Sequence, residues 1–91
     1  MTTNEMLIDL FRRFEDAKTP VQVSFGDGSL YDLRILSTMH AEEGGDIVAD
    51  VLRSIQSSRP RSWSGTAMNF NLDDVVRVET DGECVFTRLG G

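Results

Sequence analysis

Two adjacent carboxylates, Asp73 and Asp74, stand between two short apolar runs in the stretch MNFNLDDVVRVE. Paired carboxylates can hold a divalent cation or work as an acid–base pair, but either use requires both groups to converge on one point. Side chains of adjacent residues that lead into a strand point to opposite faces. We therefore expect a tight turn here, closed by a hydrogen bond from Asn71 or Asp73 to the nearby backbone.

A second candidate for chemistry is His40, which lies in the stretch MHAEEGGD together with Glu42, Glu43 and Asp46. One imidazole and several carboxylates could bind a divalent metal ion. His40 is the only histidine of the chain, and its surroundings are typical of a solvated hairpin loop. We predict no metal site within one chain, and a site shared between chains of an oligomer stays an alternative.

Cys84 is the only cysteine, which excludes an intrachain disulfide and a cysteine-rich zinc site. It precedes Val85 in a strand-like stretch, so we expect a buried cysteine that serves as a small hydrophobic residue. The sequence contains no nucleophile–base pair, phosphate-binding loop or metal-ligand spacing. We therefore predict that the protein is not an enzyme, has no catalytic residues and needs no cofactor.

The loop SSRPRSWSG carries Arg59, Arg61 and Trp63 within a stretch, residues 51–65, that has no acidic residue. Arginine and tryptophan together suit stacking on a nucleic-acid base or anchoring a protein partner. These three residues are the predicted site for nucleic acid or a partner. The alternative is that Trp63 begins a strand and covers one end of the core.

The overall charge limits how nucleic acid could be bound. Fifteen acidic residues against nine basic ones give a net charge of −6. A sequence-independent grip on phosphates requires a basic face, so the charge disfavours it outside the arginine-containing loop.

The 91 residues are enough for one domain, 1–91, and not for two. No apolar run approaches the roughly 18 residues that cross a membrane. The N-terminal stretch MTTNEMLIDLF also lacks the basic start of a signal peptide. We expect a cytoplasmic protein without a membrane partner.

The spacing of apolar residues predicts an amphipathic helix over 3–17, followed by strands. Thr2 and Glu5 have the spacing of a capping box, and the proline at position 20 ends the helix. Predicted ion pairs join Asp9 to Arg13 and Arg12 to Asp16 on the solvent side. The apolar stripe consists of Leu7, Leu10, Phe11 and Phe14.

Beyond the helix the apolar period changes to two, which predicts antiparallel strands. VQVSF and SLYDLRILSTM form a hairpin around Gly26-Asp27-Gly28. Residues 46–56 suit either a strand covered on both sides or a helix, and their valines and isoleucines favour the strand. TAMNF, VVRVE and CVFTR are three further strands, with a hairpin turn at Asp81-Gly82.

This order of elements resembles the Sm-like small β-barrel, including Hfq-type proteins and Rof-type inhibitors of Rho. The resemblance rests on the helix 3–17, on VSFGDGSLYDLRIL and on FNLDDVVRVE, which places a short 3₁₀-like turn between two strands. It implies a mainly β (α+β) fold, with the helix on a strongly bent five- or six-stranded antiparallel barrel over 20–88. It also implies a homo-oligomer that binds RNA or single-stranded DNA without catalysis.

Two alternatives remain at this point. Rof-type proteins are acidic and bind another protein, so an acidic regulatory protein is the first. The C-terminal Gly90-Gly91 resembles ubiquitin-like and sulfur-carrier proteins, which is the second. Their β-grasp fold would fit a hairpin over 21–39 and a helix over 46–56.

Overall fold

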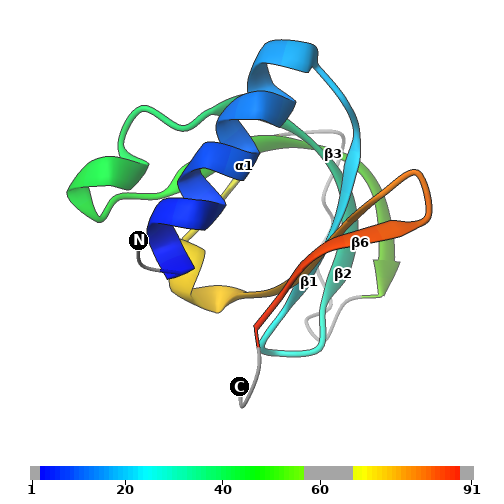
Figure 1. The fold of residues 1–91 in the computed structure, drawn as a ribbon. Coiled ribbons are helices and arrows are strands. Elements are labelled where there is room, and N and C mark those ends of the chain that lie inside the picture. Colours follow the sequence, from blue (N-terminus) through cyan, green and yellow to red (C-terminus); the bar gives the residue numbers. More distant parts are fainter. Residues whose placement is uncertain (1–2, 57–66, 89–91) are drawn as a thin grey trace.

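The computed structural model describes residues 3–56 and 67–88 of the chain. Within these residues one helix precedes six strands, and two short 3₁₀ turns lie between strands (Figure 1). In chain order the elements are α1 (Thr3–Ala17), β1 (Val21–Phe25), β2 (Leu30–Ser37), η1 (Ala41–Glu43), β3 (Ile47–Gln56), β4 (Ala67–Phe70), η2 (Leu72–Asp74), β5 (Val75–Thr80) and β6 (Glu83–Thr87).

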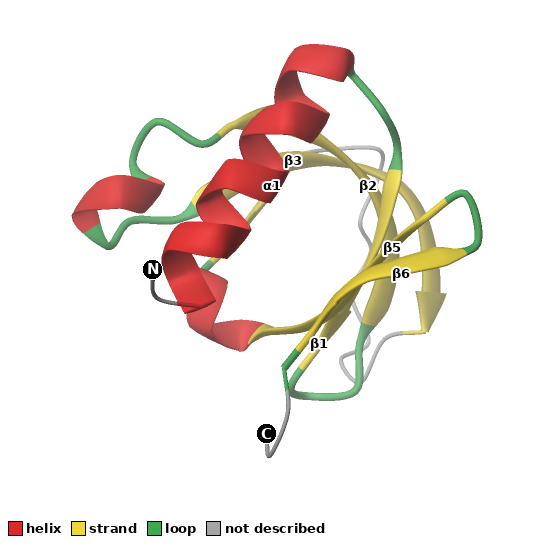
Figure 2. Cartoon of the chain, in the orientation of Figure 1, coloured by secondary structure: helices red, strands yellow, loops and turns green. Residues whose placement is uncertain are grey.

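The six strands form one antiparallel sheet in the order β4-β3-β2-β1-β5-β6. The sheet curves around the core, and α1 lies across the open side of the curve (Figure 2). The predicted fold class, an N-terminal helix on a bent six-stranded antiparallel sheet, is confirmed. The prediction that the sheet closes into a barrel is wrong. Within residues 3–56 and 67–88, no backbone hydrogen bonds pair the two edge strands β4 and β6. The edge of β5 that does not pair with β1 is occupied by β6 instead of β4.

The pairing skips one residue of a strand at five places in the sheet. Such bulges disrupt the ladder locally and bend the strand that carries the extra residue. The skipped residues are all apolar: Leu36, Leu52, Ile55, Val76 and Val85. The sequence pattern gave no sign of them, because period-two alternation predicts a strand but not its register.

Helix α1 has the predicted bounds and buries one face. Leu7 and Phe11 are fully buried and Phe14 nearly so, as expected. Leu10 is only partly buried and Ile8 takes its place in the core, which turns the buried stripe slightly around the helix axis. Lys18, with φ 55°, ends the helix in the left-handed conformation, so the chain turns before β1.

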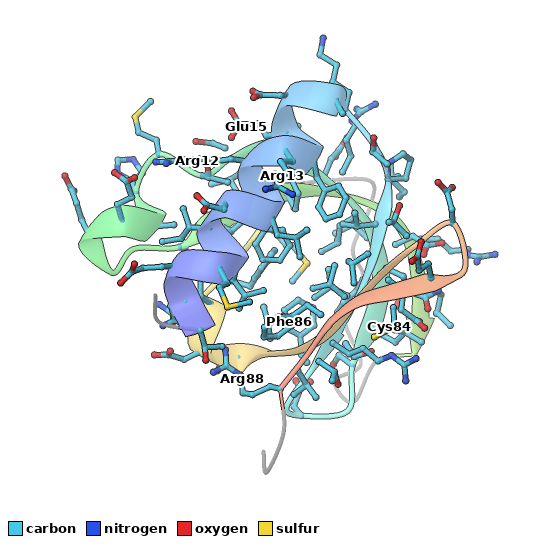
Figure 3. All side chains as sticks on the ribbon, in the orientation of Figure 1. Arg12, Arg13, Glu15, Cys84, Phe86 and Arg88 are labelled. Atoms are coloured by element: carbon cyan, nitrogen blue, oxygen red, sulfur yellow. The ribbon has the colours of Figure 1, made fainter. Side chains whose placement is uncertain are left out.

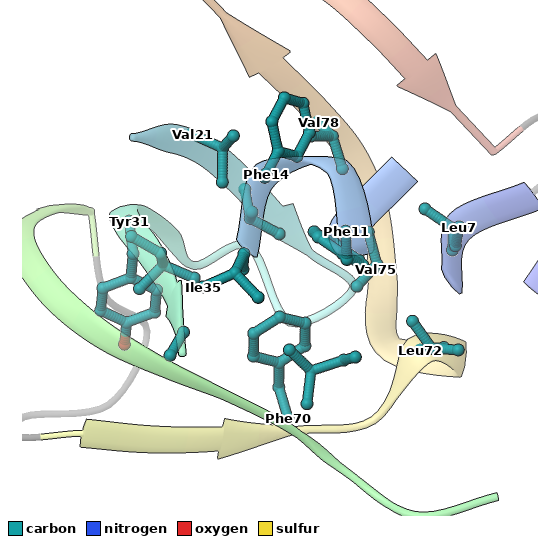
Figure 4. Close-up of a cluster of buried hydrophobic side chains, with 14 of the residues drawn as sticks. Leu7, Phe11, Phe14, Val21, Tyr31, Ile35, Phe70, Leu72, Val75 and Val78 are labelled. Atoms are coloured by element: carbon teal, nitrogen blue, oxygen red, sulfur yellow. The ribbon is translucent and has the colours of Figure 1, made fainter. Parts of the chain in front are cut away.

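Aromatic contacts in the core join the helix to the edge strand β4 and to the inner strands β1 and β2 (Figure 4). The Phe11 ring meets the Phe70 ring edge to face at 5.7 Å between centroids, and Phe70 meets Phe25 at 5.1 Å. Phe25 in turn meets Tyr31 at 6.0 Å. Aromatic pairs prefer such tilted geometries, so α1, β4, β1 and β2 share one packed cluster.

Residues 47–56 are strand β3, which decides the ambiguity of this segment in favour of the strand. The helix that a β-grasp fold would need at 46–56 does not form. The expected cover on both sides of this strand is wrong: Ile47, Ala49 and Val51 are buried, but the side chain of Leu52 is 45% exposed. Leu52 and Ile55 of β3 are therefore exposed on the outer side of the sheet.

Both predicted hairpin turns are confirmed. Gly28 has φ 90° and the Asp27 carboxylate accepts a hydrogen bond from the Ser29 N–H at 2.9 Å. At the β5–β6 turn, Asp81 and Gly82 have φ 52° and 77°. Within the described ranges, no helix combines the length and apolar character that a bilayer crossing requires.

Candidate binding surfaces

Asp73 and Asp74 belong to the turn η2, as predicted. The Asn71 side-chain oxygen accepts from the Asp73 N–H at 3.0 Å, which caps the turn. The Asp73 carboxylate accepts from the Asn4 amide at 2.9 Å and so ties the turn to the start of α1. Among the residues that the structure describes, no group of three or more histidine, cysteine or acidic side chains is arranged to hold a metal ion.

Arg88 also connects η2 to the start of α1. This role was not predicted from the sequence. The Arg88 guanidinium donates to the carbonyl oxygens of Val75 and Leu72, both at 2.9 Å, and to the Asn4 side chain at 3.5 Å. It also lies 5.9 Å from the centre of the Phe86 ring (Figure 3). Arg88 therefore fastens the end of β6 to η2 and α1. An arginine near a chain end gives no sequence signal for such a role.

His40 lies beside two of its neighbouring carboxylates, Glu43 and Asp46, in a shallow hollow. The hollow, of about 510 Å³, is bordered by His40, Glu43, Gly45, Asp46, Val48 and Asn69. The chain folds back tightly here, since a Cβ on Gly45 would lie 2.8 Å from the Cβ and carbonyl oxygen of His40. Glycine at position 45 is what allows this return.

Cys84 is exposed, so the expectation of a buried cysteine is wrong. The skipped residue Val85 places Cys84 opposite Glu79 on the edge strand, while Phe86 pairs with the buried Val78. The Cys84 thiol contacts the Phe86 carbonyl oxygen at 3.4 Å.

An acidic surface runs along α1 and η1. Its shallow hollow of about 330 Å³ is lined by Glu5, Ile8, Asp9, Arg12 and Glu42. An ion pair between Arg12 and Glu42 connects the two elements, and Arg12 points toward η1 in Figure 3. It replaces the predicted pair of Arg12 with Asp16, because η1 brings a carboxylate from another part of the chain within reach.

Hydrogen bonds between Glu15 and Thr38 join the C-terminal end of α1 to the segment that follows β2. One Glu15 carboxylate oxygen accepts from the Thr38 N–H at 3.1 Å and from the Thr38 hydroxyl at 2.9 Å. Thr38 is 4% exposed, so this polar contact is shielded from water.

We refer to Glu5, Asp9, Arg12 and Glu42, together with Glu43, as the acidic helix surface. The first four line the hollow, and Glu43 follows Glu42 on η1 and lines the neighbouring hollow beside His40.

The charges of the described residues are strongly unbalanced. Residues 3–56 and 67–88 contain all fifteen acidic residues and seven of the nine basic ones, a balance of −8. Four of these seven basic side chains are in ion pairs: Arg12–Glu42, Arg34–Asp50, Arg53–Asp32 and Arg77–Glu79. The positive charges that remain are few, and the described surface is anionic.

The outer face of β2 and β3 differs from the rest of this surface. Leu36, Leu52 and Ile55 are 45%, 45% and 40% exposed, and each is a residue that the pairing skips. Between them the ion pairs Arg34–Asp50 and Arg53–Asp32 both measure 3.1 Å. We call these seven residues the β2–β3 face. This face combines three exposed apolar side chains with two ion pairs, and its net charge is zero.

The predicted binding residues Arg59, Arg61 and Trp63 lie outside the described residues, as do Thr2 of the predicted capping box and Gly90-Gly91. Their roles stay predictions. Comparisons with protein-family models, with curated proteins and with solved structures find no match to this chain.

Proposed function

We propose that the protein is a non-catalytic binding module of Sm-like type that recognises a basic segment of another protein through the acidic helix surface. The carrying observation is the charge distribution. Three carboxylates and one arginine line the hollow of this surface, and a fourth carboxylate, Glu43, adjoins it on η1. The arginine is already paired with one of the carboxylates. A surface with this excess of negative charge attracts cationic partners and repels phosphates.

The geometry of α1 and η1 also supports binding in this place. Ile8 lines the hollow together with the carboxylates and is 9% exposed, so it adds a small apolar contribution to this surface. Met39, beside η1, is 73% exposed. Methionine adapts its shape to different apolar partners. A partner segment with alternating basic and apolar side chains would match this arrangement.

The resemblance to Sm-like proteins enters the same proposal. The order of α1 and β1 to β5, with a 3₁₀ turn before β5, agrees with the pattern on which the resemblance rests. Of the two functions that it implies, protein binding fits the −8 balance of the described residues better than RNA binding does. We also propose that the protein acts in the cytoplasm, as expected from the sequence.

Binding of single-stranded nucleic acid is the second candidate, and the sequence cluster Arg59, Arg61 and Trp63 favours it. Stacking of one base on tryptophan contributes about 1–3 kcal/mol. Removing one phosphate-binding side chain lowers the slope of log affinity against log salt by about 0.7 on a single strand. Replacing both arginines by alanine would then make the affinity less dependent on salt. Trp63→Ala would lower the affinity but leave its salt dependence unchanged.

One titration separates the two functions. The probes are a short synthetic peptide of alternating lysine and leucine and a single-stranded uridine oligomer, both fluorescently labelled and titrated at low salt. We expect the peptide to bind and the RNA not to bind. RNA binding at affinities equal to or above those of the peptide would overturn the proposal.

Two matched variants locate the peptide site. Asp9→Asn with Glu43→Gln removes two negative charges from the acidic helix surface, and Asp81→Asn with Glu83→Gln removes two from the β5–β6 turn. Exposed charge pairs contribute about 0.2–1 kcal/mol each, so the first variant should weaken peptide binding roughly fivefold to tenfold. The second should change it less than about twofold, within the range of screened, distant charges.

A further inference from the structure

We infer that two copies of the chain associate through the β2–β3 face, packed sheet against sheet around a two-fold axis. This inference does not depend on the proposed function. α1 packs against the buried side of the sheet, whereas the β2–β3 face is its outer side. The partner surface and the self-association surface therefore do not overlap.

The first observation is that the apolar side chains of Leu36, Leu52 and Ile55 are exposed on this face, each at a bulge in the pairing. On β2, the buried Tyr31, Leu33 and Ile35 alternate with outward residues that include Leu36. On β3, Leu52 follows the buried Val51. Bulges are enriched where a strand must re-aim a side chain, including at sites of binding. An exposed apolar face of a sheet is stabilised when another sheet covers it, at a spacing of about 10 Å.

The second observation identifies the occupant. The β2–β3 face has two arginines and two aspartates and no net charge. The rest of the described chain has thirteen acidic residues against five basic ones. Two copies that approach by other faces bring like charges together, which is unfavourable. The β2–β3 face is where two anionic copies can meet without that repulsion.

The ion pairs of this face are also self-complementary. A two-fold interface places the same patch on both subunits, so each arginine of one copy can meet an aspartate of the other. The arginine side chains of Arg34 and Arg53 are 46% and 70% exposed, against 29% and 28% for their aspartate partners. Because exposed ion pairs contribute little, the guanidinium groups can turn toward a second copy at small cost.

The size of the face sets the strength of the dimer. β2 has eight residues, about 26 Å of strand at the usual rise. Two such strands offer an area at the small end of specific interfaces. We therefore expect a dimer that dissociates at micromolar concentrations, so the mass in solution depends on concentration.

Sedimentation equilibrium over a range of concentrations up to high micromolar tests the inference. The wild type should pass from one chain mass to twice that mass. Leu52→Glu places an unpaired charge in the interface and should raise the dissociation constant at least about tenfold. Val85→Glu is the matched control, since Val85 is also a skipped residue, is 38% exposed on β6 and gains the same charge; it should stay within about twofold of the wild type.

Wild type that remains monomeric throughout, or a control variant that weakens the dimer as much as Leu52→Glu does, would overturn the inference. Circular dichroism checks that both variants fold. If Leu52→Glu does not, hydrogen exchange of the wild type decides the matter: the amides of residues 48–55 should exchange more slowly at high than at low concentration. Equal exchange at both concentrations would also contradict the inference.

Discussion

Replacing Phe11 by alanine tests the packing of α1 on the sheet most severely. The Phe11 side chain is fully buried, and its ring meets Phe70 at 5.7 Å. Buried phenylalanine to alanine changes cost about 3–5 kcal/mol, and the edge-to-face pair contributes about 0.5–1.5 kcal/mol beyond area burial. We therefore expect the free energy of unfolding to fall by about 4 kcal/mol, in the middle of the measured range.

That loss is large for a chain of 91 residues, whose total stability should be about 5–14 kcal/mol. A change of 1 kcal/mol shifts Tm by about 4–8 °C at this size, so Tm should drop by at least about 15 °C. Urea unfolding followed by far-UV circular dichroism gives the free energy directly. Met6→Ala, on the same helix at a side chain 54% exposed, should cost less than about 0.5 kcal/mol. A loss below about 1 kcal/mol for Phe11→Ala would refute the docking of α1.

Three further changes test the junctions of the fold in the same urea assay. Arg88→Met removes a charged donor from two carbonyl oxygens and should cost about 2–3 kcal/mol, whereas Arg34→Met at an exposed ion pair should cost at most about 1 kcal/mol; equal losses would count against a special role of Arg88. Asn71→Ala removes the cap of η2 and should cost about 0.5–2 kcal/mol, and no loss would mean that the turn closes without it. Gly45→Ala forces a Cβ to within 2.8 Å of the His40 backbone and should lower the free energy of unfolding by about 1–3 kcal/mol. An unchanged free energy would show that the backbone at positions 40 and 45 is not closely packed.

Much of the fold could be predicted because it depends on local sequence. The helix is predicted by the spacing of its apolar residues, and its end at Ala17 is predicted by Pro20, since the residue before a proline avoids helical dihedral angles. The hairpins follow from glycine and aspartate at the two turns, where φ is positive. The strand at 47–56 could be chosen over a helix because its valines and isoleucines favour extended backbone.

What could not be predicted depends on register and on distant contacts. The sequence pattern predicts that Leu52 and Ile55 belong to a strand covered on both sides. In the structure both residues lie at bulges in the β2–β3 pairing, and their side chains are exposed. Arg12 pairs with Glu42 because the fold brings η1 beside α1. Arg88 binds carbonyl oxygens that are hydrogen-bond acceptors in every sequence, so residue identity gives no hint of its partners.

The candidate sites divide along the same line. Asp73 and Asp74 could be assigned to a turn from the geometry of adjacent residues, and the Asn71 cap confirms it. The acidic helix surface was not predicted, because Glu42 and Glu43 are far in sequence from Glu5 and Asp9. The cluster of Arg59, Arg61 and Trp63, by contrast, is predicted from the sequence and lies outside the described residues.

The central claim is that the acidic helix surface, rather than the loop carrying Arg59, Arg61 and Trp63, binds a cationic protein segment. Calorimetric titration of the lysine–leucine peptide into two variants tests it most directly. One has all three loop residues replaced by alanine, and the other combines Asp9→Asn with Glu43→Gln. We predict that the loop variant binds the peptide like the wild type, while the acidic-surface variant binds it about five to ten times more weakly. Loss of binding in the loop variant with full binding in the other would contradict the claim.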